Sequence, residues 1–102
     1  MDRQRGSVRA KIHSLEPHEG GRATGLFTGY RPMVFLWSDR REAHDAVLII
    51  EGSDICPPGE DCVARIEFLR PEAFLQLLTE GAGFDLAEGR RVVARGTITE
   101  IL

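Results

Sequence analysis

The sequence predicts an all-β fold: a six-stranded antiparallel Greek-key barrel with one short helix near residues 71–80. Extended segments with apolar residues at alternate positions recur along the chain, and breaks rich in glycine and proline separate them. The 102 residues suffice for one domain, and 42% hydrophobic with 28% charged residues is an ordinary globular composition. A closed barrel is the expected arrangement of such strands because it leaves no exposed sheet edge.

The first half of the chain supplies three strands. Residues 1–6 are polar and without periodicity, so we expect a frayed N-terminus, with the single barrel domain spanning residues 7–102. Residues 8–12 alternate apolar and polar, which is typical of a strand with one buried face. Residues 33–37 and 46–50 are apolar on both faces, and this pattern is expected where both faces of a strand are covered.

The second half supplies the other three strands. Residues 62–69 alternate with their even-numbered side chains predicted to point inward. Residues 83–88 and 91–102 follow as two further strands around a glycine turn, and the even-numbered residues from 92 to 98 are expected to share one face.

Between these strands lies a segment with helical spacing. Pro71 precedes apolar residues at 74, 75, 77 and 78, and Gly81 comes just after them. Proline in a first turn and glycine beyond a last turn favour a short helix of about two to three turns.

Charge and composition restrict the classes of function. The net charge is −3, and Lys11 is the only lysine among thirteen basic residues, so strong autonomous binding to nucleic acid is disfavoured. No apolar run is long enough to span a membrane and no signal sequence is evident, so we expect a cytoplasmic protein without a membrane partner. Cys56 and Cys62 flank a Pro-Pro-Gly turn; reduced thiols are expected there, and a disulfide between them is left open.

Residues 20–37 read GGRATGLFTGYRPMVFLW, in which a GGRxT motif precedes a YRP motif and Phe35. Farther along come, in order, the motifs PGED, EFLRP and EG and a final Ile-Leu. Together these residues resemble the C-terminal β-barrel, domain 3, of elongation factor Tu and related translational GTPases. The resemblance covers about residues 8–102, nearly the whole chain.

The resemblance implies a six-stranded Greek-key barrel that packs against other domains and helps to hold the T-stem backbone of aminoacyl-tRNA. The chain departs from the family at Ala23, Met33 and Ala87, where the family carries a histidine, a glutamine and a basic residue. No GxxxxGK[ST] loop is present, so no GTP is expected, and the domain is interpreted as a stand-alone barrel. The residues that would contact tRNA or other RNA are Arg22, Thr24, Glu88, Gly89, Arg90 and Arg91.

The residues indicate no enzyme, no cofactor and no metal. The three histidines and two cysteines lack recognised metal-ligand spacings, and no nucleophile motif occurs. Arg22 is interpreted as a structural arginine that pairs within the chain, in preference to a ligand contact, and Arg31 is expected to form an internal salt bridge. A redox or metal enzyme that uses Cys56 and Cys62 is the weakest of the hypotheses.

The outward side chains of the apolar run at 33–37 need cover, because a closed barrel needs only one apolar face. The segment 74–78 of the same chain is one candidate for that cover, and a partner protein or a second copy of the chain is the other. The first hypothesis is therefore a non-catalytic protein-interaction module, with a tRNA- or RNA-binding accessory domain as the alternative. The predicted protein interface comprises Met33, Phe35, Trp37, Phe74 and Leu78.

Overall fold

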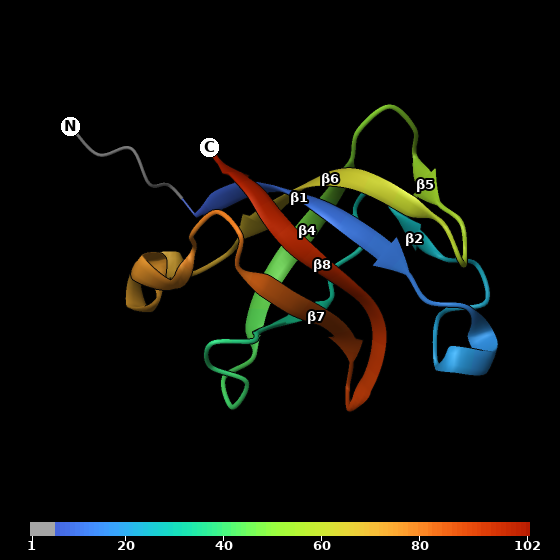
Figure 1. Cartoon of the computed structure of the whole chain (residues 1–102), viewed down its shortest axis with the longest axis horizontal. Helices are drawn as coiled ribbons and strands as arrows, with labels where there is room; N and C mark the ends of the chain where they lie inside the picture. Colours follow the sequence, from blue (N-terminus) through green and yellow to red (C-terminus); the bar gives the residue numbers. More distant parts are fainter. Residues whose placement is uncertain (1–5) are drawn as a thin grey trace.

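Six strands of the computed structural model close into an antiparallel barrel, with the order β1-β6-β4-β3-β7-β8 around the barrel and β8 paired back onto β1. The structure describes residues 6–102. In Figure 1 the red β8 crosses in front of β4, and β1 lies beside it. The barrel strands are β1 (Ser7–Ser14), β3 (Met33–Leu36), β4 (His44–Ile50), β6 (Asp61–Phe68), β7 (Gly83–Glu88) and β8 (Arg91–Ile101).

The connectivity is that of a Greek key. β3, β4 and β6 follow one another in the chain and lie side by side, and β6 pairs with β1. β1 and β3 are therefore successive barrel strands in the sequence that are not adjacent in space. The long connection between them carries the 3-10 turn η1 (Pro17–Glu19) and the strand β2 (Leu26–Phe27), which pairs with β5 (Ile55–Cys56) as a separate two-stranded sheet. The predicted all-β, six-stranded Greek-key barrel is thus confirmed.

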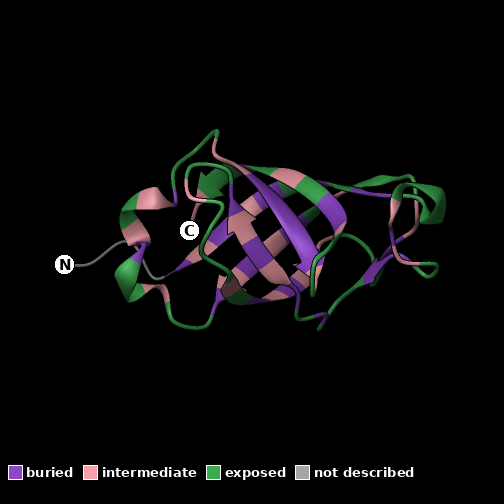
Figure 2. Cartoon of the chain, turned by 90° about the horizontal axis from the view of Figure 1, so that it is seen from below, coloured by how far each residue is buried: buried purple, intermediate pink, exposed green. Residues whose placement is uncertain are grey.

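The barrel interior holds the inward face of every strand. Figure 2 shows buried and more exposed residues alternating along the strands, as the period-two patterns predict. On β3, Val34 and Leu36 are fully buried, whereas the outward Met33 and Phe35 are half-buried. The even-numbered residues of β6 from 64 to 68 point inward as expected.

The predicted common face of the even-numbered residues of β8 is wrong at the start of the strand, at Val92. A shift between Leu86 and Ala87 inserts an extra residue into β8, so that Leu86 faces Ala94 and Ala87 faces Val92. Such a β-bulge exchanges the inward and outward positions on one side of it. Val93 is consequently fully buried and Val92 only half-buried.

Residues 71–80 do not form one helix of two to three turns. They form two 3-10 turns, η2 (Pro71–Ala73) and η3 (Leu75–Leu77), separated by Phe74, whose φ of −140° is not helical. Phe74 and Leu78 are both buried in the core. At the break, the Phe74 ring stacks on the ring of His44, with ring centroids 3.7 Å apart. The segment therefore closes one end of the barrel (Figure 1).

The expected frayed stretch, residues 1–6, lies outside the described residues except for Gly6. Gly6 is buried, and a Cβ atom there would come within 2.5 Å of the Pro71 ring. Its backbone oxygen accepts a hydrogen bond from the amide of Phe68 at 2.9 Å. Gly6 thus belongs to the folded part of the chain. No helix in residues 6–102 is long and apolar enough to cross a membrane.

Candidate functional site

A polar cluster forms where the turn after η1 meets the end of β7. Gly20, at φ 101°, and Gly21 let the chain fold back tightly, since a Cβ atom at Gly21 would lie 1.8 Å from the backbone oxygen of Leu15. This turn directs Arg22 toward Glu88, the last residue of β7. Residues of the GGR and EG motifs, distant in the sequence, are thereby brought together.

Glu88 is the centre of this cluster. Its Oε2 atom accepts hydrogen bonds from Nη1 of Arg22 and from the hydroxyl of Tyr30, the latter at 2.7 Å. Its Oε1 atom accepts a hydrogen bond from Nη2 of Arg91 at 2.9 Å. Arg22 also donates from Nε to the backbone oxygen of Gly25 at 2.8 Å. One carboxylate therefore joins the turn, the approach to β3 and the β7–β8 hairpin.

Aromatic rings complete the environment of Arg22. Its guanidinium carbon lies 4.8 Å from the Tyr30 ring centroid and 5.5 Å from that of Phe27, within the range of cation–π attraction. The two rings contact each other at a centroid separation of 5.2 Å. Arg22 is thus held by an acid, a backbone oxygen and two aromatic rings, so the expected pairing of Arg22 within the chain is confirmed.

The ionisation of the cluster is stable around neutral pH. The hydrogen bond from Tyr30, followed by those from Arg22 and Arg91, lowers the pKa of Glu88 below its ordinary value of 4.5. Burial, aided by the neighbouring Glu88, raises the pKa of Tyr30 above its ordinary value of 10.0. An ionised carboxylate beside a protonated phenol supports binding or structure, and neither group is poised to exchange a proton near pH 7.

The structure brings the predicted RNA-binding residues into one region. Arg22 and Thr24 lie in the turn that ends at Gly25, and Glu88 to Arg91 form the hairpin joined to it by the Arg22–Glu88 pair. Arg90 and Arg91 are exposed at this hairpin, where Gly89 adopts φ 58°. The predicted internal salt bridge of Arg31 is not found among the described residues, and Arg31 is exposed to solvent.

Tyr30 is the cluster residue that the sequence analysis used only as a family marker. A tyrosine hydroxyl close to an arginine and a glutamate needs a partner once its ring is buried. The YRP motif was the available signal, but the alignment of Tyr30 with Glu88 depends on pairing between β3 and β7, which the sequence does not specify.

The predicted protein interface is divided by the fold. Met33 and Phe35 lie half-buried on the outer face of β3, and the Trp37 side chain beyond the strand is 46% exposed. Phe74 and Leu78 instead lie in the core, so in this structure they offer no surface to a partner. They pack at the barrel end, against residues such as His44 and Phe68.

Both cysteines are free thiols in environments that oppose reactivity. Burial raises the pKa of Cys56 and that of Cys62, which favours the neutral thiol over the nucleophilic thiolate. Cys56 donates from Sγ to the backbone oxygen of Glu60 at 3.5 Å. Within residues 6–102 no group of three or more histidine, cysteine or acidic side chains is placed to hold a metal ion.

The closed six-stranded barrel, with the Glu88 cluster at one end, places the chain in the class of small antiparallel β-barrel domains. The family model described as the elongation factor Tu C-terminal domain matches residues 3–102. The chain belongs to this family, in which the domain is non-catalytic, and its membership implies a role related to translation.

Proposed function

We propose that this domain is a non-catalytic, cytoplasmic protein-interaction module of translation, and that its partner docks on the outer face of β3 and β4. The observation that carries the proposal is an outward apolar strip on these two strands, extended by the residue that follows β3. The strip consists of Met33, Phe35, Trp37, Val47 and Ile49.

The strip follows from the two-faced apolar runs of the sequence. Met33 pairs with Asp45 across the two strands, and Val47 shares with Asp45 the outward face of β4. The buried positions of β3 and β4 already fill the barrel, so these outward side chains contribute nothing to its interior. Phe74 and Leu78, the chain's own candidates for covering them, are used at the barrel end.

The size of the strip suits one part of a larger contact. Complete burial of a large apolar side chain contributes about 1.5 to 3 kcal/mol, and half-buried side chains contribute less. A stable interface covers about 800 Å² on each partner, so the strip would form the apolar centre of a contact with a polar rim. Asp45 and the exposed Arg31 flank the strip and would belong to that rim.

Affinity enrichment and light scattering test this proposal. The tagged wild-type protein is expected to enrich translation proteins or to self-associate, whereas a Phe35→Ser and Val47→Ser double variant loses at least about tenfold in capture, equivalent to about 1.4 kcal/mol. Val63→Ser is the matched control, because Val63 is an exposed apolar residue on β6 outside the strip. Circular dichroism verifies the fold of each variant. A strictly monomeric protein that captures nothing, or equal losses in the control, would contradict the proposal.

RNA binding is the second candidate, and one observation favours it. All six predicted RNA-binding residues gather around the 22–25 turn and the β7–β8 hairpin, where Arg90 and Arg91 are exposed. Against it stand the overall charge of −3 and the engagement of Arg22 by Glu88. Arg91 also donates to Glu88, so the remaining affinity for phosphate would come mainly from Arg90, with Arg91 beside it.

A tRNA titration at about 50 and 200 mM salt decides between the two candidates. If RNA binds here, an Arg90→Ala and Arg91→Ala double variant loses affinity, and the slope of log affinity against log salt decreases by about 0.9 for each phosphate contact removed. Arg65→Ala is the control, since Arg65 lies on β6 and pairs with Glu67. Absence of binding at the lower salt concentration would eliminate the RNA candidate.

A further inference from the structure

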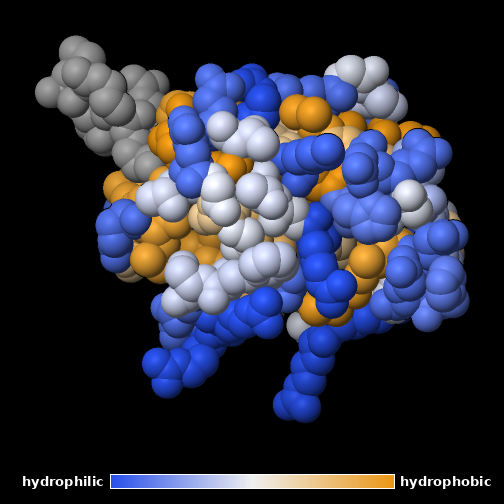
Figure 3. Space-filling model, in the orientation of Figure 1, coloured by the Kyte–Doolittle hydropathy of each residue, from blue (hydrophilic) through white to orange (hydrophobic). Residues whose placement is uncertain are grey.

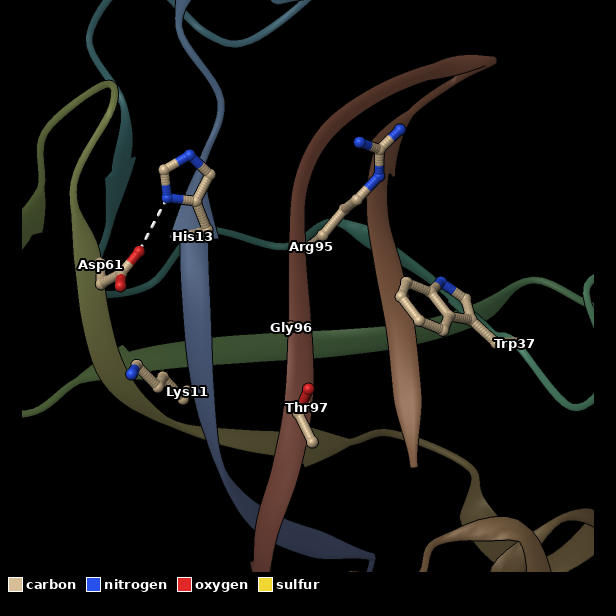
Figure 4. Close-up of a pocket in the computed structure, with 7 residues that line it drawn as sticks. All are labelled: Lys11, His13, Trp37, Asp61, Arg95, Gly96 and Thr97. Carbon is tan, nitrogen blue, oxygen red and sulfur yellow. Dashed lines mark hydrogen bonds and ion pairs between the residues drawn. The ribbon is translucent and has the colours of Figure 1, made fainter. Parts of the chain in front are cut away.

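A groove crosses the outer face of β8 and β1 and ends at Trp37. Its volume is about 230 Å³. Figure 4 shows Trp37 on one side, Lys11, His13 and Asp61 on the other, and the β8 backbone between them. The same face in Figure 3 has a pale, weakly polar centre bordered by strongly hydrophilic side chains.

The strand register explains the hollow. Thr97 lies directly opposite Lys11, and Arg95 lies opposite His13, so the outward residues of β8 and β1 are matched in two rows. Gly96, between the two β8 residues, lines the groove with backbone alone. Small groups therefore form the floor, and longer side chains form the walls (Figure 4).

The tryptophan wall is fixed in place before any ligand arrives. Gly83 leaves room for the indole, since a Cβ atom there would come within 2.4 Å of the Trp37 ring. The indole Nε1 atom donates to Oδ1 of Asp85 at 3.0 Å. The six-membered ring of Trp37 is directed toward β8 and Gly96 (Figure 4). An aromatic edge of this kind favours contact with a second planar ring.

Lys11 is the cation of the groove that forms no direct ion pair with a described residue. Asp61 is engaged by Nδ1 of His13 at 2.7 Å, and Asp85 lies 3.5 Å from Nε of Arg95. No ion pair involves Lys11 within residues 6–102, and its side chain is exposed. The groove thus holds an ammonium without a direct ion pair, an aromatic wall and the terminal nitrogens of Arg95.

We propose that this groove binds a nucleoside monophosphate, with the base against Trp37 and Arg95 and the phosphate at Lys11. The volume is below the range of about 300 to 1,000 Å³ typical of drug-sized ligands, so it suits one ring system with its charged group at the open rim. Lysine binds phosphate as a compact point charge, whereas the planar guanidinium of arginine stacks on aromatic rings. The groove lies apart from both the β3–β4 docking strip, except for the shared Trp37, and the Glu88 cluster.

The proposal has a direct spectroscopic test. Trp37 is the only tryptophan, so its single indole N–H resonance reports on the groove in a ¹⁵N-correlated NMR titration. AMP is expected to shift this resonance in a saturable way. Adenosine, which lacks the phosphate, and inorganic phosphate, which lacks the base, are each expected to bind at least about fivefold more weakly than AMP.

Two matched variants locate the phosphate. Lys11→Gln is expected to weaken AMP about three- to fivefold, the effect of losing one exposed ion pair, while Arg65→Gln on β6 leaves the affinity unchanged. Both residues are on the barrel surface, and the dispersion of the NMR spectrum verifies that each variant folds. Lack of saturation up to about 10 mM AMP, or equal affinity in Lys11→Gln, would overturn the proposal. Tighter binding of a 5′-phosphorylated RNA trinucleotide than of AMP would overturn the assignment to a free mononucleotide.

Discussion

At the Ser7 end of β1 an apolar closure of the barrel is formed by buried side chains. Beyond its Ser14 end the buried Leu26 and Cys56 also belong to the core, and a network of ion pairs and hydrogen bonds, here named the polar closure, joins the surrounding turns. The apolar closure consists of the two 3-10 turns, with Phe74 placed between the rings of His44 and Phe68. The polar closure is centred on Glu88.

The two closures differ in what surrounds them. Phe74 is 6% exposed and packs in the continuous core, so its removal would leave a cavity that the rigid barrel cannot collapse to fill. The Glu88 cluster is partly open to solvent, and water can replace a lost partner there. We therefore expect the apolar closure to determine stability and the polar closure to determine the local geometry of the GGR turn and the hairpin.

Phe74→Ala should have the largest effect. Truncation of a buried phenylalanine costs about 3 to 5 kcal/mol, through lost burial and the remaining cavity. The free energy of unfolding, from urea or guanidinium denaturation, measures this loss. Leu69→Ala is the control: Leu69 follows β6 and is 43% exposed, so a change within about 0.5 kcal/mol is expected. Equal losses in the two variants would show that the segment is not part of the cooperative core.

Glu88→Gln should have an intermediate effect. The variant keeps an oxygen for the Tyr30 hydroxyl but removes the negative charge shared by Arg22 and Arg91, and we expect a loss of about 1 to 2 kcal/mol in the free energy of unfolding. Tyr30→Phe, which removes a single hydrogen bond, should cost about 0.5 to 1.5 kcal/mol. A loss with Glu88→Gln as large as that with Phe74→Ala would contradict the distinction between the two closures.

The sequence predicts these two ends unequally well. The GGR, YRP and EG motifs identify the polar closure, because glycines with positive φ and an acid at a hairpin leave recognisable residues. The contact of Tyr30 with Glu88 is set by the pairing of distant strands, which local patterns do not encode.

The apolar closure is harder to predict, because the spacing of apolar residues at 74–78 fits one continuous helix as well as it fits two 3-10 turns. Burial of Phe74 against His44 favours a break that no periodicity shows. The groove at Trp37 is likewise absent from the patterns, since its lining comes from β1, β6, β8 and the residue after β3. The alternation of residues predicts which face of a strand is buried, but cross-strand register decides which outward residues meet.

Lowering the pH should destabilise the two closures in two different pH ranges. Of the three predicted effects on stability, this one is the smallest. Burial lowers the pKa of His44 below its ordinary value of 6.5, although Glu42, Asp39 and Asp45 oppose the shift, and its Nε2 atom is buried without a hydrogen-bond partner among residues 6–102. The unfolded chain therefore binds a proton at His44 more readily than the folded chain. Stability should fall as the pH falls below 6.5.

The pKa of Glu88 is lowered from 4.5, so the stability that its ionised form contributes is present above pH 4.5 and is lost at lower pH. Glu51 loses its charge in the same range, because its hydrogen bond with Arg9 also lowers its pKa from 4.5. Denaturation midpoints measured from pH 7.5 to 3.5 record both ranges. His44→Gln should abolish the slope between pH 6.5 and 4.5 and keep the slope below it. Glu88→Gln should keep the upper slope and reduce the lower slope, to which Glu51 still contributes. An unchanged upper slope in His44→Gln would assign the titration to another histidine and separate it from the apolar closure.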